Sequence, residues 1–279
     1  MNPAIPPHVS FVRTRLAPLV KLKDDYVSPD YLDQYAIKCR GLDFYNGTPL
    51  DPRSNKPVSH AEKFTQLIPY ERMNQSIQAT QPWKDPDYGD SSHLGYWDPG
   101  LDNWWYANKI GERLNMYLFN HYKARTEHVM GVIGDTKWDG MAVPPEYELN
   151  QQDDVVKWAV THIWQRRTPE PPHVVCALAD RVPLRNDRIS VPELRTILTL
   201  GGVRVVDEGY SNCKRIPVTV VSAAGTQLRI VVGVVDSRNK TVEVRKGPII
   251  DFAEGEVKKW KEWITVLSWI IGDPLGKTD

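Results

Sequence analysis

The spacing of apolar and polar positions divides the chain into a Pro-rich first part and a strand-like last third. In the last third, four runs rich in Val and Ile are separated by Gly and by polar turns, a pattern typical of strands joined by hairpins. Ser190 and Glu193 form a capping box that predicts a helix to Leu200. A closing helix is expected over residues 254–271. The expected strands span residues 203–206, 216–222, 227–235 and 241–246.

Helices are expected in the first part wherever a cap or a helical period of apolar residues occurs. Ser28 followed by Pro29 is an N-cap with Pro in the first turn. Trp158 and Ile163 belong to an apolar stripe that follows two Asp residues, which favour a helix N-terminus. The Pro-rich stretches between the helices are expected to be loops. The expected helices span residues 29–39, 59–78, 101–132 and 153–167.

These elements predict an α+β protein with a mostly helical, Pro-rich N-terminal part that contains long irregular segments, followed by a small antiparallel-sheet domain closed by a C-terminal helix. Pro169, Pro171 and Pro172 suggest the boundary between the two. The predicted division is an extended basic arm over 1–27, a helical region with long aromatic-rich loops over 28–168, and a small α+β domain over 169–279.

Charge is balanced over the whole chain but not along it. Lys plus Arg and Asp plus Glu both number 35, which argues against a strongly basic nucleic-acid coat. The first 23 residues carry four basic side chains and no acidic one, whereas residues 24–102 carry 7 basic and 13 acidic ones. A basic arm beside an acidic segment indicates attachment to partners of different charge.

Cysteine use and the N-terminal composition bear on the compartment. The three cysteines are far apart, with no C-x-x-C, which favours a reducing intracellular compartment. The basic, acid-free start also fits a mitochondrial targeting peptide, although its prolines interrupt the amphipathic helix of such a peptide. An uncleaved arm that lies on a partner is the alternative. No transmembrane helix is expected.

Sequence motifs of common enzymes are missing from the chain. There is no G-x-S-x-G, no phosphate-binding Gly loop and no H-E-x-x-H, so no catalytic residue, metal site or cofactor is predicted. An enzyme alternative remains, with a site assembled from distant residues. Its candidates are His162, His173 and Cys176, or the acidic loop 85–98.

The leading hypothesis is a non-enzymatic structural subunit of a large intracellular, conceivably mitochondrial, multi-protein assembly. A basic arm and aromatic-rich loops gain order when they lie across neighbouring proteins, and aromatic residues are common at interfaces. The residues expected to bind protein partners are Arg13, Arg15, Trp83, Tyr88, Tyr96, Trp97, Trp104 and Trp105.

Contact with RNA, in a ribosome-like ribonucleoprotein, is the second alternative. Basic side chains cluster before and within the predicted sheet, and several on one face would bind the phosphate backbone. Binding of this kind would weaken steeply with salt. The residues expected to contact RNA are Arg185, Arg188, Arg195, Lys214, Arg215, Arg245 and Lys246.

Overall fold

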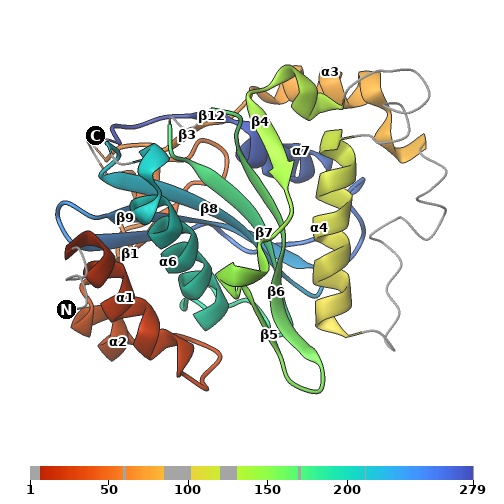
Figure 1. Ribbon diagram of the computed structural model, residues 1–279. Coiled ribbons are helices and arrows are strands. Elements are labelled where there is room, and N and C mark those ends of the chain that lie inside the picture. The colour runs from red at the N-terminus through yellow and green to blue at the C-terminus, as the bar shows by residue number, and fades with distance from the viewer. Residues whose placement is uncertain are drawn as a thin grey trace.

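A large mixed sheet is the centre of the molecule in the computed structural model, which describes residues 7–58, 61–84, 102–119, 131–168, 171–210 and 212–278. The strands of this sheet are β1 (Ile37–Leu42), β2 (Pro49–Leu50), β4 (Trp138–Met141), β5 (Asn150–Gln152), β6 (Val156–Arg166), β7 (Val174–Asp180), β8 (Arg215–Ala224), β9 (Gln227–Asp236), β10 (Thr241–Lys246) and β11 (Ile250–Asp251). Their order is β2-β1-β10-β9-β8-β7-β6-β4, with β5 beside β6 and β11 beside β9. Figure 1 shows β6 to β9 at the centre of the molecule.

The sheet combines parallel and antiparallel pairs. β1 is parallel to β10 and β7 is parallel to β8, whereas the other neighbours are antiparallel. The expected fold class, a mostly helical part followed by a small antiparallel sheet, is therefore wrong. The strands of the first part add to the sheet of the last third, and β6 pairs with β7 across the expected boundary near residue 169.

Helices cover both faces of the sheet (Figure 1). One face packs against α1 (Pro7–Val20), α2 (Pro29–Gln34) and α6 (Val191–Val206), and the other against α3 (Tyr70–Thr80), α4 (Asn103–Phe119) and α7 (Trp260–Ile271). A separate pair of short strands joins β3 (Thr65–Gln66) to β12 (Asp273–Pro274). Because both faces are covered, β7, β8 and β9 are buried almost along their whole length, which explains their nearly continuous apolar sequences.

The capping box and the hairpin pattern predict the last third well. Ser190 Oγ accepts a hydrogen bond from Glu193 N, and α6 begins there as expected. The expected strands at 216–222, 227–235 and 241–246 are β8, β9 and β10. The expected strand at 203–206 is wrong, because α6 continues through Gly201 and Gly202 to Val206.

The helix expected over 153–167 is instead β6. Its buried positions include Trp158, Val160, Ile163 and Trp164, and the pairing register with β7 shifts between Val160 and His162. This bulge interrupts the alternation of buried residues, so that the apolar spacing resembles a helical period. The β-branched and aromatic content of the segment is nevertheless that of a strand.

The extended arm expected over 1–27 is also wrong where the structure describes it, because residues 7–20 form α1. Pro7 occupies the first helical position, where no backbone hydrogen bond is lost, and Pro18 lies in the last turn.

Four of the other expected helices differ in their bounds. α2 begins at its Ser28 cap but ends at Gln34, before β1. The helix expected from Ser59 is replaced by β3 and by α3, which follows Pro69. α7 begins at Trp260, and α4 is described from Asn103 to Phe119; residues 120–130 of the helix expected to residue 132 lie outside the described residues. Across the described helices, none combines the length and apolar character required to cross a bilayer.

Candidate protein-binding groove

Helices α1 and α6 lie side by side on one face of the sheet (Figure 1). Phe11 and Leu19 of α1 are buried in the core between this helix and the sheet. Gly202 allows the close approach, since a Cβ atom there would lie 2.7 Å from Cγ1 of Val12. The sequence therefore builds a helix pair whose outer sides remain at the surface.

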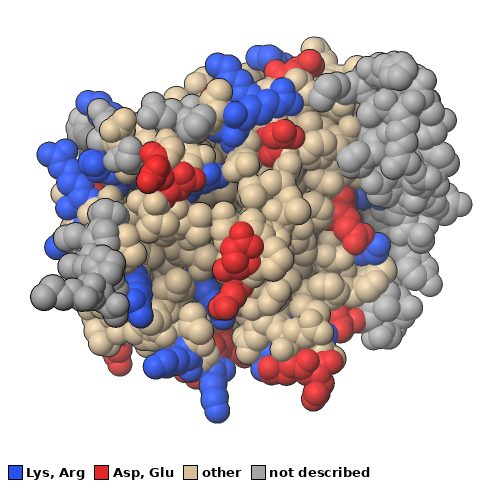
Figure 2. Space-filling view, in the orientation of Figure 1, with Lys and Arg blue, Asp and Glu red and all other residues tan. Residues whose placement is uncertain are grey.

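An apolar groove of about 540 Å³ follows this helix pair. Val12 and Leu198 are buried within it, whereas Val20 and Val206 are 47% and 53% exposed. Uncharged side chains make up most of the surface over α6 (Figure 2). The groove is lined by Val9, Val12, Arg13, Leu16, Ala17, Val20, Lys21, Leu198, Thr199, Gly202, Val203 and Val206.

The charge of the groove is basic. Arg13 and Lys21 are the two charged side chains among the lining residues, and both are exposed. Among the described residues, the lining contains no carboxylate, histidine or cysteine. Its chemistry suits an apolar segment that carries negative charge.

The two arginines predicted in the arm have different surroundings. Arg13 lines the groove, as described. Arg15 instead donates hydrogen bonds to the carbonyl oxygens of Tyr35, Phe11 and Lys240 at 3.0, 3.1 and 3.2 Å. Arg15 thus joins α1 to the rest of the fold, and its guanidinium lies 4.1 Å from the Phe11 ring.

The predicted aromatic contact residues are divided by the structure. The Trp83 ring lies 6.4 and 6.1 Å from those of Tyr117 and Trp260, and Trp83 keeps 37% of its surface exposed. Trp104 packs against the core from the start of α4, and Trp105 packs edge-on against the next residue. Tyr88, Tyr96 and Trp97 lie outside the described residues, as does the acidic loop 85–98.

The seven basic residues predicted for RNA contact fall at three places on the molecule. Arg185 and Arg188 lie before α6, close to Lys246, whose Nζ donates to the Asn186 carbonyl. Arg195 lies on α6 and donates to the Glu148 carbonyl at 3.0 Å. Lys214 and Arg215 lie at the open end of the β8–β9 hairpin, and the Arg245 side chain, from β10, reaches the same group of residues through the Glu62 carbonyl.

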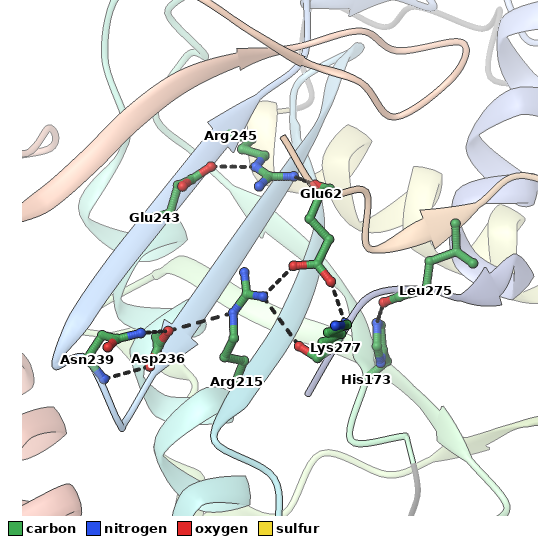
Figure 3. Close-up of polar contacts among 9 residues, drawn as sticks. All are labelled: Glu62, His173, Arg215, Asp236, Asn239, Glu243, Arg245, Leu275 and Lys277. Carbon is green, nitrogen blue, oxygen red and sulfur yellow. Dashed lines mark hydrogen bonds and ion pairs between the residues drawn. The ribbon is translucent and has the colours of Figure 1, made fainter. Parts of the chain in front are cut away.

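A polar network surrounds the last of these groups (Figure 3). The Glu62 carboxylate accepts hydrogen bonds from Arg215 Nη1 and from the backbone N–H of Lys277. Burial would raise the pKa of Glu62, but these two donors lower it below the usual value. Arg245 donates to Glu243 at 2.7 Å and to the Glu62 carbonyl at 2.6 Å.

This network fixes the C-terminal segment to the sheet, near the place where Lys and Arg side chains gather at the upper left of Figure 2. Arg215 and Arg245 have carboxylate partners within the fold, and both guanidiniums lie about 5 Å from the Phe64 ring. Contact of the seven residues with RNA remains a prediction.

The side chains proposed for the enzyme alternative are not assembled into one site. Cys176 is fully buried on the α6 face, and burial raises the pKa of its thiol. His162 lies on the opposite face, near Gly111 of α4. His173 is buried too, and its Nε2 lies 3.0 Å from the Leu275 carbonyl oxygen.

Sequence reasoning missed the groove itself. The signal was present in α1, where Val9, Val12, Leu16 and Val20 recur at three- to four-residue spacing. The prolines of that segment favour an extended chain, and the Val-rich sequence at the end of α6 resembles a strand. Comparison with known proteins finds no matching family model, no matching curated protein and no matching solved structure.

Proposed function

We propose that this protein is a non-enzymatic subunit of an intracellular multi-protein assembly and that it binds a partner protein through the α1–α6 groove. The observation that supports this proposal is the groove, a concave apolar surface with exposed Val20 and Val206 at its edge. Burial of the exposed apolar surface of Val20 and Val206 against a partner would contribute favourable binding free energy.

The proposal is tested by changing the groove without disturbing the core. Val20→Glu combined with Val206→Glu, here called the groove variant, places two charges at exposed positions of the groove. Val257→Glu is the matched control, since Val257 is 66% exposed before α7 and does not line the groove. Thermal unfolding of each purified variant establishes that the fold is retained.

Tagged full-length proteins are then purified from cells with nuclease treatment, and the complexes are sized and identified by mass spectrometry. We expect defined partners with the wild type and with Val257→Glu, and at least a tenfold loss of these partners from the groove variant. Identical partner profiles for all three proteins would contradict the proposal. A wild-type monomer without partners would also contradict it.

A further inference from the structure

We propose that the segment bound in the α1–α6 groove is an amphipathic α-helix of a different protein, with two acidic residues at its edge. This inference rests on the proposed function and adds the chemical nature of the partner. The arguments come from the shape of the groove, the state of its backbone groups and its charge.

The shape of the groove suits a helix better than a membrane surface. Val12 and Leu198, which are buried, lie in the groove, and the exposed Val20 and Val206 are higher on its sides. A bilayer surface would cover the raised positions without contacting the recessed ones. A helix is convex, and its apolar ridge can enter the space between two neighbouring helices.

The backbone of the groove also favours a helix over an extended peptide. An extended peptide commonly gains affinity by hydrogen bonding to an open strand edge. Here both sides of the groove are α-helices, α1 and α6, whose inner N–H and C=O groups are paired within each helix. An α-helix satisfies its own backbone groups and needs only side-chain contacts.

The charge of the groove selects among helical partners. Arg13 and Lys21 line it, and no acidic residue does within the part of the chain that the structure describes. A second copy bound through this same surface about a two-fold axis would place these basic side chains near one another, which opposes self-association. An acidic partner would instead be attracted by both basic side chains.

The positions of the two basic residues indicate a spacing for the acidic ones. Arg13 and Lys21 are eight residues apart, which corresponds to about 12 Å along a helix axis. The α6 side of the groove spans residues 198–206, about 13 Å of helix, so the groove accommodates two to three turns of a partner. A partner helix aligned with α1 would meet both charges with Asp or Glu seven or eight residues apart.

The inference is tested by selection with the purified full-length protein. The probe is a displayed library of 20-residue peptides with Leu at helical spacing and with Glu, Gln, Ala and Lys randomised at the flanking positions. We expect enrichment of peptides with two Glu residues seven or eight positions apart. Selected peptides are then made synthetically, and their affinities are measured by fluorescence anisotropy at low and high salt.

Variants of the protein test whether the selected peptides bind in the groove. Arg13→Glu combined with Lys21→Glu should lower the affinity for the acidic peptides at least tenfold. The same variant should bind more tightly to peptides that carry Lys in place of the two Glu residues. The groove variant should lose binding, and Val257→Glu should keep it. Enriched peptides without the acidic pair, binding that the charge reversal leaves unchanged, or no groove-dependent binder at all would overturn the inference.

Two controls separate the alternatives. Groove-dependent binding to vesicles of phosphatidylcholine and phosphatidylserine, without peptide selectivity, would favour a membrane surface and overturn the inference. If cellular partners depend on the groove but their cross-linked segments are extended or lack acidic residues, the inference fails while the proposed function stands. If cellular partners do not depend on the groove, the proposed function itself fails.

Discussion

Arg229 and Glu193 form an ion pair that is fully buried between β9 and the start of α6. Arg229 Nε donates to Glu193 Oε1 at 2.7 Å, and Glu193 Oε2 accepts from Ser190 N at 2.8 Å. The guanidinium also donates to the backbone carbonyl of Arg188 at 3.1 Å. Removal of water from two charges is unfavourable, so such a pair fixes geometry more than it adds stability, and removal of one partner is strongly destabilising.

We expect Glu193→Gln to lower the free energy of unfolding by about 3–5 kcal/mol, because it leaves the Arg229 charge buried without a counter-ion. Glu193→Gln combined with Arg229→Met should be less destabilised than the sum of the single changes. Equilibrium unfolding in guanidinium measures both, with Glu208→Gln at an exposed position as the control. Strict additivity of the two changes would contradict this account.

Asp180 is a second buried acid near the start of α6. It is 1% exposed, its Oδ1 accepts from Val182 N at 3.0 Å, and its Oδ2 has no hydrogen-bond partner among the described residues. Burial, together with the charges of Glu193 and Asp25, raises the pKa of Asp180 to about 7. The neutral acid is therefore the form that the fold prefers.

The pH dependence that follows has a definite sign. The folded protein holds this proton more tightly than the unfolded chain, so the stability contributed by protonation is full below about pH 4 and is lost as the pH rises through about 7. We expect Asp180→Asn to remove this loss and to be more stable than the wild type at pH 8. Unfolding free energies between pH 4 and 8 test it, with exposed Asp154→Asn as the control.

At the scale of elements, the C-terminal segment depends on a buried histidine. β12 pairs with β3, and His173 Nε2 contacts the Leu275 carbonyl oxygen next to that pair. Burial lowers the pKa of His173 to about 4, although contacts with the backbone oppose the shift. The fold therefore favours the neutral ring, and stability present above about pH 6.5 is lost as the pH falls through about 4.

We expect His173→Gln to reduce this acid sensitivity while a side-chain N–H remains available for the Leu275 carbonyl. Hydrogen exchange of residues 273–278, measured between pH 7 and 4, should show earlier opening of the segment in the wild type than in the variant. Equal pH dependence in both proteins would refute a role for His173 in the acid response.

Local signals in the sequence predict some elements correctly and give the wrong structure for others. The Ser190 capping box identified the start of α6, and the runs after it identified β8 to β10, because their geometry depends on neighbouring residues. β6 was missed because its bulge moves buried side chains out of simple alternation. The α1–α6 groove was missed because its two sides lie nearly 200 residues apart in the sequence.

At the scale of the whole molecule, the sheet unites the first and last parts of the chain. β1 pairs with β10, and β6 pairs with β7 through seven residue pairs. We expect a single cooperative unfolding transition, with coincident midpoints from tryptophan fluorescence and from far-ultraviolet circular dichroism. Two separated transitions would instead support independent domains on the two sides of residue 169.

The parallel pairing of β1 with β10 has a consequence for biosynthesis. About 200 residues separate the two strands, and chains emerge from the ribosome at about 5–20 residues per second, so β1 waits about 10–40 s for its neighbour. The α1–α6 surface likewise joins two helices that lie nearly 200 residues apart in the sequence. Nascent chains would therefore pass through a period in which β1 is paired with β2 on one side only, and the edge that later meets β10 is open.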